Sequence, residues 1–203
     1  EADEGDKCLT GIPELKSTDA LGIGPGIGKD QQTVYALEEV LRNFSKPVVI
    51  DADALNLLSE HTHLQELIPE NSILTPHPGE FSRLVGEWND DFERLEKQRD
   101  LAERLNAIIV LKGAHTSVAM PDRSVYFNVS GNPGMATGGS GDVLTGVLTA
   151  LLAQGIEPSN AALTGVYAHG LAGDIAARYK SQIGMTAGDL IEYLPEAWSL
   201  LEP

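Results

Sequence analysis

The sequence predicts an α/β fold built on a mostly parallel sheet with helices on both faces, and three recurring observations predict it. Short apolar runs recur along the chain, a polar turn ends each run, and a stretch with helical spacing follows. Runs that are apolar throughout are typical of strands buried on both faces, and strands that alternate with helices favour a parallel sheet. Four such strands are expected, at Ala20–Ile23, Val48–Ile50, Ser72–Leu74 and Ile108–Leu111.

The segments after these runs carry apolar residues at helical spacing. In the stretch from Asp30 to Phe44 these residues fall at positions 34, 37, 40, 41 and 44. Two alternating segments, Thr116–Met120 and Ser124–Val129, flank a Pro-Asp pair and predict a β-hairpin. A short helix is expected at 54–59, and another follows Glu80 and ends at Val85. Longer helices are expected at 92–105, 143–152, 160–179 and 187–200.

Length and composition restrict the class of protein. A chain of 203 residues suits one α/β domain with a substantial core, and we expect residues 1–203 to form it, with 1–14 as an acidic, irregular lead-in. The net charge of −16 opposes binding to nucleic acid or to an anionic membrane, so we expect neither partner. The single cysteine, Cys8, excludes an internal disulfide framework and is typical of a reducing cytoplasm. No apolar run approaches a membrane span, and the chain lacks an initiator Met, as a fragment would.

The most informative segment covers residues 132–146 and reads NPGMATGGSGDVLTG. Gly138, Gly139 and Gly141 leave a turn without side chains just before a predicted helix. Several backbone N–H groups and the positive end of the helix dipole therefore converge on one point, which attracts phosphate. Asp142 lies there, where a carboxylate gains nothing from a neighbouring anion unless it handles a proton or a metal. A base beside an anion site is suited to moving a phosphoryl group onto a hydroxyl.

A flexible loop before an ordinary core helix is the alternative interpretation of this segment, since glycines cluster in many turns. Thr137 and Ser140 add hydroxyl donors at the start of the helix and favour the functional interpretation. Neither the G-x-x-x-x-G-K-[ST] phosphate loop nor the G-x-G-x-x-G dinucleotide fingerprint fits this segment.

Other polar motifs also follow predicted strands, whose C-terminal ends bind ligands in this architecture, so we expect the motifs to converge. The GIGPGIG segment, 22–28, is either a tight turn or a place where a ligand presses on the backbone. Asp51 and Asp53 either cap the next helix or contact a ligand, and the two roles are compatible. Lys112, followed by Gly113, either reaches a nucleotide phosphate or stays solvated.

His77 is the strongest candidate among the histidines. Pro76 and Pro78 fix the backbone on either side of it, which suits a positioned hydrogen-bond partner for a substrate. A purely structural Pro-His-Pro turn is the alternative. We expect Glu80 to cap or orient the following helix, and we expect His169, which lies in the middle of a helix, to make a helix–helix contact.

Together these motifs resemble those of the ribokinase-like superfamily and, within it, of the ADP- or ATP-dependent NAD(P)H-hydrate dehydratases. The resemblance spans Ala20 to about Leu194. Six motifs in order make it specific, whereas Gly-Gly-Ser-Gly-Asp alone indicates only the superfamily. They are GIGPGIG (22–28), DADALN (51–56), TPHPGEF (75–81), LKGAHT (111–116), NPGMATGGSGDVLTG (132–146) and HGLAGD (169–174).

The resemblance implies a repair reaction on NAD(P)H that carries a hydroxyl on C6 of its reduced ring. Asp142 would accept the proton of that hydroxyl while the terminal phosphoryl group of ADP or ATP transfers to the oxygen. Phosphate is a far better leaving group than hydroxide, so its elimination restores the ring double bond. The net result is dehydration driven by nucleotide hydrolysis, a lyase reaction at a kinase-type site.

The resemblance also implies which residues meet the hydrated dinucleotide. Gly26 and His77 should contact it, and Asp142 should touch its reactive hydroxyl. Asp53 and Asn56 are weaker candidates near the same substrate.

The nucleotide would bind beside these residues. The amides of Gly138, Gly139 and Gly141 should form an anion hole, worth about 3–4 kcal/mol per well-placed donor. A Mg²⁺ ion is expected as a charge neutraliser, without a dedicated cage of protein ligands. The residues that should hold the nucleotide are Lys112, Gly113, Ala114, His115, Thr116 and Gly141.

Members of this family normally carry a further segment before the first strand, with a small-residue loop and a strand that completes the sheet, so the N-terminal part of the fold is expected to be missing here. The resemblance also implies linkage to an NAD(P)H-hydrate epimerase domain and a homo-tetramer. Two alternatives stay open: a ribokinase-like kinase that acts on a vitamin-precursor hydroxyl, and a nucleotide-binding module without turnover. TPHPGEF and DADALN together argue against the kinase, and Asp142 argues against the binding module.

Overall fold

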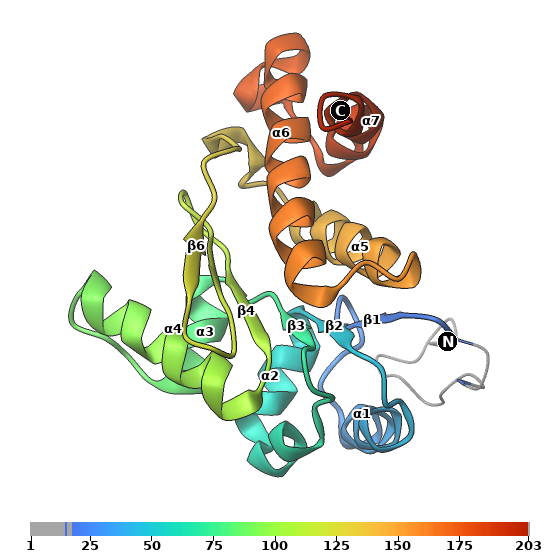
Figure 1. Ribbon diagram of the computed structural model, residues 1–203, viewed down its shortest axis with the longest axis vertical. Coiled ribbons are helices and arrows are strands. Elements are labelled where there is room, and N and C mark those ends of the chain that lie inside the picture. Colours follow the sequence, from blue (N-terminus) through green and yellow to red (C-terminus); the bar gives the residue numbers. More distant parts are fainter. Residues whose placement is uncertain (1–14, 16–17, 203) are drawn as a thin grey trace.

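A six-stranded sheet forms the centre of the structure (Figure 1). The structure is a computed structural model that describes residue 15 and residues 18–202, so the expected lead-in at 1–14 lies outside the described residues. The strand order is β1-β2-β3-β4-β5-β6; β1 to β4 pair in parallel, and β5 and β6 are antiparallel, which confirms the mostly parallel sheet and the hairpin. The strands are β1 (Leu21–Ile23), β2 (Val48–Ile50), β3 (Ile73–Leu74), β4 (Ile108–Leu111), β5 (Ser117–Ala119) and β6 (Val125–Phe127).

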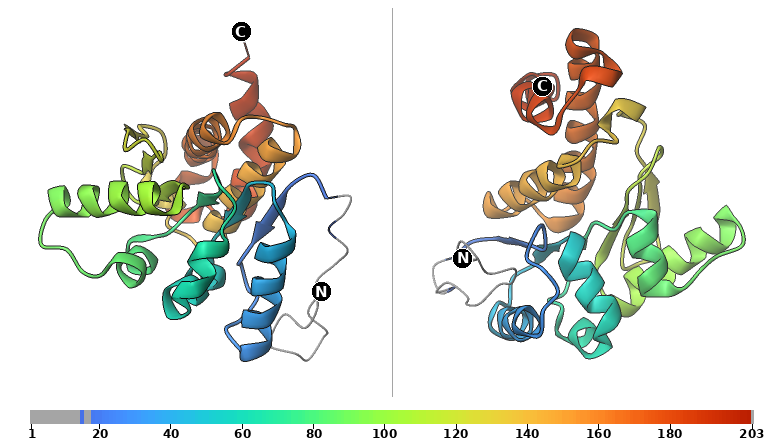
Figure 2. Two further views of the ribbon diagram at one scale, coloured as in Figure 1. Left: turned by 60° about the horizontal axis from the view of Figure 1, so that its bottom comes forward. Right: turned by 180° about the vertical axis from the view of Figure 1, so that it is seen from behind.

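Helices cover both faces of this sheet, as predicted (Figure 2). Successive strand residues point to opposite faces. In β2, Val48 and Ile50 therefore join one core and Val49 joins the other. The first face carries α1 (Gln31–Asn43), α2 (Ala52–Glu60), the 3-10 helix η1 (Thr62–Leu67), α3 (Pro78–Val85) and α4 (Asp91–Leu105). The second carries α5 (Ser140–Ala153), α6 (Pro158–Gly184) and α7 (Ala187–Ser199), and the short η2 (Pro133–Met135) precedes α5.

Helix α5 begins three residues earlier than the sequence predicts, at Ser140 instead of Val143. Gly139, with φ 87° and ψ −11°, turns the chain immediately before the helix, a left-handed conformation that glycine adopts without strain. Gly141 and Asp142 therefore belong to the first turn of α5 and not to a separate loop. Helix α6 is also longer than expected, and its backbone leaves helical geometry at Ser181. None of the described helices is both long and apolar enough to cross a membrane.

The polar motifs that follow the parallel strands converge at one edge of the sheet, as expected. The Asp51 N–H donates to the carbonyl of Ile23 at 3.0 Å, and the Thr75 N–H donates to the carbonyl of Ile50 at 3.0 Å. The Lys112 N–H donates to the carbonyl of Pro76 at 2.8 Å. These bonds extend the sheet ladder past the strand ends, so the residues that follow β1 to β4 lie side by side at this edge, and α5 packs on β1 and β2.

Candidate active site

The Gly-Gly-Ser-Gly-Asp segment forms the N-terminus of α5. The N–H groups of Ser140, Gly141 and Asp142 lie in the first turn of the helix, where an α-helix offers no intrahelical acceptor. The Ser140 N–H donates to the carbonyl of Thr137 at 3.3 Å. The N–H groups of Gly141 and Asp142, together with the helix dipole, therefore make this end positive. Asp142 is exposed there, so its carboxylate is accessible to a ligand at the same helix end. The structure therefore brings the predicted anion site and the predicted base together.

The loop that leads into this turn is fixed on α6. The Asp174 carboxylate accepts from the N–H of Gly131 at 2.9 Å and from the side-chain amide of Asn132 at 3.0 Å. A Cβ at Gly173 would overlap the sulfur of Met135, so only glycine lets the loop approach the helix so closely. The HGLAGD motif on α6 thus holds the NPGM loop in place, which is a structural role.

His169 ties α6 to the first turn of α5. Its Nε2 lies 3.0 Å from the carbonyl oxygen of Ser140, which confirms the expected helix–helix contact. Burial lowers the pKa of His169 to about 4; the Ser140 carbonyl acts in the opposite direction, and the charge of Lys112 lowers the pKa further. The ring is therefore neutral at neutral pH and donates its Nε2 proton to Ser140.

The stability of the fold should fall as the pH drops from about 6.5 to 4 because of His169. The unfolded chain protonates this ring below about pH 6.5, whereas the folded chain does so only near pH 4. The contribution of His169 to the free energy of unfolding is therefore fully present above pH 6.5. It falls by about 3 kcal/mol by pH 4, since the unfolded state binds the extra proton. His169→Gln does not titrate, so its free energy of unfolding in urea should lose this part of the pH dependence. Equal pH slopes for the two proteins would contradict the expectation.

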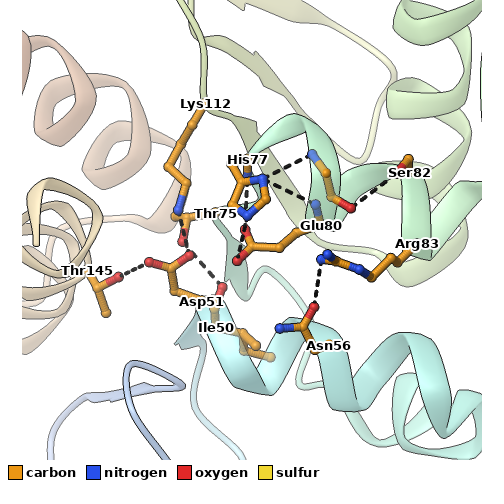
Figure 3. Close-up of polar contacts among 11 residues, drawn as sticks. Ile50, Asp51, Asn56, Thr75, His77, Glu80, Ser82, Arg83, Lys112 and Thr145 are labelled. Carbon is orange, nitrogen blue, oxygen red and sulfur yellow. Dashed lines mark hydrogen bonds and ion pairs between the residues drawn. The ribbon is translucent and has the colours of Figure 1, made fainter. Parts of the chain in front are cut away.

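Asp51 is buried directly beneath the start of α5 (Figure 3). Its Oδ1 accepts from the Lys112 ammonium at 2.7 Å, and its Oδ2 accepts from the Thr145 hydroxyl at 3.0 Å. A Cβ at Gly141 would lie 3.3 Å from the Lys112 nitrogen and 3.4 Å from Asp51 Oδ2. The first turn of α5 therefore lies on this ion pair, and the glycine leaves room for it.

This geometry corrects two of the alternatives drawn from the sequence. Asp51 occupies the N-cap position of α2, but its side chain makes no capping hydrogen bond, because Lys112 and Thr145 engage both of its oxygens. Lys112 is not a solvated lysine, because its ammonium pairs with a carboxylate that is only 2% exposed.

The GIGPGIG loop closes over the start of α2. Gly24 has φ +133°, and a Cβ there would overlap the carbonyl oxygen of Asp51. The N–H of Gly28 donates to Asp53 Oδ2 at 3.0 Å, so Asp53 holds the loop and does not cap its own helix. Gly26 has φ +68° and open space around it, as a backbone that faces a ligand would.

His77 caps α3. Its Nδ1 accepts from the N–H groups of Gly79 and Glu80 at 3.0 and 3.3 Å, and the Glu80 carboxylate accepts from the His77 N–H at 2.8 Å. This capping box confirms the role expected of Glu80 and accounts for the Pro-His-Pro turn structurally. The His77 side chain is 51% exposed, so contact with a substrate stays a prediction. Nearby, the Asn56 side-chain carbonyl accepts from Arg83 at 2.9 Å.

The turn between β4 and β5 carries the rest of the predicted nucleotide site. Gly113, Ala114 and His115 are exposed, and the Thr116 hydroxyl closes the turn by donating to the Gly113 carbonyl at 3.3 Å. Within this segment Lys112 reaches the first turn of α5, while the following residues stay at the surface. Gly138 is also exposed, with open space around it.

Two cavities border Asp142. One, of about 700 Å³, lies between α5 and the β1 end and is shared by the GIGPGIG loop, Asp142 and Thr145. The other, of about 960 Å³, lies between α5 and α7 and is mainly apolar, with Trp198 in its wall. Both volumes fall in the range of small-molecule sites. The first cavity joins the predicted base to the loop predicted to meet the substrate.

A divalent cation would be held here mainly through phosphate oxygens. The described part of the chain contains no group of three or more His, Cys, Asp or Glu side chains that could hold a metal ion. Both oxygens of Asp51 are engaged, which leaves Asp142 as an exposed carboxylate at the helix end. Mg²⁺ bound by one or two carboxylates plus substrate phosphates fits this arrangement.

The sheet topology, together with a glycine-rich helix start and an acidic residue at the carboxyl edge, defines a ribokinase-like protein. Solved structures agree. An ADP/ATP-dependent NAD(P)H-hydrate dehydratase from Bacillus subtilis, co-crystallised with ATP/Mg²⁺, superposes with a TM-score of 0.79 at 34% identity, over 91% of this chain and 65% of that one. A ribokinase-like superfamily protein from Enterococcus faecalis has a TM-score of 0.73 at 30% identity, over 90% of this chain and 63% of that one.

The chain belongs to the NAD(P)H-hydrate dehydratase family, whose sequence profile matches residues 2–196. A bifunctional NAD(P)H-hydrate repair enzyme from Moorella thermoacetica is 46% identical over 193 residues, 94% of this chain and 36% of that protein. An ADP-dependent (S)-NAD(P)H-hydrate dehydratase from Neisseria meningitidis is 40% identical over 196 residues, 89% of this chain and 65% of that protein. The chain thus spans about a third of the length of the bifunctional relative.

The pairing of Asp51 with Lys112 and Thr145 was not predicted from the sequence. A signal for Thr145 exists: it is a polar residue at an inward helical position beside Leu144 and Leu148, which are both buried. A buried threonine there implies a polar partner underneath.

Proposed function

We propose that this protein dehydrates hydrated NAD(P)H back to NAD(P)H in a reaction driven by ADP or ATP. The observation that carries the proposal is the exposed Asp142 carboxylate in the first turn of α5, beside the N–H groups of a glycine turn. Family membership supports it, because relatives are named ADP-dependent and ADP/ATP-dependent NAD(P)H-hydrate dehydratases.

The reaction would proceed in two stages. Asp142 accepts the proton of the C6 hydroxyl while that oxygen forms a bond to the terminal phosphorus and the phosphoryl bond of the nucleotide breaks. The amides of Gly138, Gly139 and Gly141 stabilise charge on the transferring group. Loss of phosphate from C6 and of a proton from C5 then restores the ring double bond. A bound Mg²⁺ would supply further neutralisation of phosphate charge.

The other contacts of the proposed site are assigned by motif. The hydrated dinucleotide would occupy the cavity of about 700 Å³ beside the GIGPGIG loop, next to Asp142. We assign to it Gly26, which lies between the lining residues Pro25 and Ile27, and also His77, Asp53 and Asn56, which are not among the lining residues. To the nucleotide we assign Lys112, Gly113, Ala114, His115, Thr116 and Gly141.

The test is incubation with hydrated NADH, Mg²⁺ and either ADP or ATP. We expect the near-ultraviolet absorbance of NADH to reappear in step with release of inorganic phosphate, and neither to occur without nucleotide. A phosphorylated product that persists would favour the small-molecule kinase. Nucleotide binding without phosphate release would favour the binding module. Failure to recover NADH with either nucleotide contradicts the proposal.

The full protein and its setting are part of the same proposal. Bifunctional relatives support linkage to an NAD(P)H-hydrate epimerase domain. The cytoplasmic location and the homo-tetramer stay predictions from the sequence.

A further inference from the structure

Asp51 lies where four segments of the protein meet. Its main chain is covered by Gly24 of the β1 loop and bonded to Ile23, and its carboxylate pairs with Lys112 after β4 and with Thr145 of α5. The Asp51 side chain is 2% exposed and that of Lys112 is 22% exposed. Figure 3 shows the lysine stem coming down from the β4 end onto this carboxylate.

The ion pair should persist when a phosphate binds above it. Moving the ammonium away would leave a buried carboxylate without its charged partner, which is strongly destabilising. The ammonium carries three N–H donors, and the Asp51 oxygen uses one of them at 2.7 Å. The remaining donors lie next to Gly141, at the positive end of α5.

We propose that Asp51 is a positioning residue that holds the Lys112 ammonium at a fixed place beneath Gly141, where its charge serves the phosphoryl group in transfer. This inference rests on the proposed function. A lysine released from Asp51 still attracts the nucleotide, because a flexible ammonium follows a bound phosphate. It is no longer fixed where charge develops during transfer, so the chemical step suffers and nucleotide binding does not.

The test is Asp51→Asn, which keeps the shape of the side chain and removes its charge. Acetylation of Lys112, followed by mass spectrometry with the exposed Lys46 as internal reference, should become about tenfold faster, since the carboxylate no longer shields the amine. The kcat should fall by a factor of about ten to a hundred, while the Kd of ADP or ATP rises by no more than about threefold.

Two control variants separate positioning from lost stability. Asp90→Ala removes the N-cap of α4, remote from the site, and should leave Lys112 acetylation and kcat unchanged. Lys112→Met should lower kcat, and adding Asp51→Asn to it should cause no further loss, because Asp51 acts only through Lys112. The double variant carries no buried unpaired charge, whereas Lys112→Met alone leaves the Asp51 carboxylate unpaired, so urea unfolding of both is measured and their kcat values are compared where both are folded. This comparison does not need Asp51→Asn alone to fold.

The outcomes distinguish the two proposals. If the wild type recovers NADH and Asp51→Asn keeps the wild-type acetylation rate or the wild-type kcat, the positioning role is wrong and the proposed function stands. Additive losses in the double variant also overturn the positioning role. If the wild type releases no phosphate with hydrated NADH, the proposed function fails and this role fails with it.

Discussion

Replacing Asp142 with asparagine should abolish almost all phosphate release and leave nucleotide binding intact. The amide cannot accept the proton of the C6 hydroxyl, and a general base contributes about 10²- to 10⁴-fold to the rate. The backbone N–H groups of the α5 start are untouched, so the Kd of ADP measured by calorimetry without Mg²⁺ should stay close to the wild-type value. The side chain is exposed, so the loss of its charge near the helix dipole should cost little stability.

Asp91→Asn is the matched control for this variant. Asp91 is also an exposed acidic residue in the first turn of a helix, α4, which lies on the other face of the sheet. It should reproduce the change in charge without any change in kcat. An Asp142→Asn protein that keeps more than about a tenth of the wild-type kcat would show that another group is the base.

Much of the fold could be predicted because the buried strands are short apolar runs between polar turns. Val48–Ile50 and Ile108–Leu111 have the bounds that the sequence indicates. The start of α5 could not be predicted in this way, because three glycines in four residues have low helix propensity. Contacts far away in the chain decide it instead: His169 donates to the Ser140 carbonyl, and the Asp51 ion pair lies beneath the first turn.

Contacts between residues far apart in the chain also limit what could be predicted of the site. Parallel strands bring their C-terminal ends to one edge, so the convergence of the motifs follows from the fold alone. The hydrogen-bond and ion-pair partners of each residue do not follow from the fold alone. Asp51 meets Lys112 across 61 residues of chain and Thr145 across 94. The inward position of Thr145 signals a polar partner, but nothing local in the sequence identifies that partner as Asp51. His77 shows that a local motif can also point to more than one role. Its flanking prolines suggest a positioned ligand contact, whereas its ring caps α3 in the structure.

Gly24→Ala should destabilise the protein far more than Gly26→Ala, although both glycines lie in the same loop with positive φ. At Gly24 the added Cβ would overlap the carbonyl oxygen of Asp51, which accepts from the Ala54 N–H while the Asp51 N–H donates to Ile23. The φ of +133° is in addition one that alanine avoids. Overpacking and backbone strain together should cost about 2–5 kcal/mol. Gly26 has φ +68° and an open surrounding, so alanine there should cost only about 1–2 kcal/mol.

Urea unfolding of both variants, with KM for hydrated NADH measured in parallel, separates the packing constraint at Gly24 from the substrate contact proposed for Gly26. Gly24→Ala should lower stability and also disturb Asp51, so that kcat falls along with it. Gly26→Ala should keep most of its stability and raise KM, because its Cβ points into open space where the dinucleotide is proposed to bind. Equal losses of stability in the two variants would mean that positive φ alone restricts both glycines. A Gly26→Ala protein with unchanged KM would remove this residue from the substrate site.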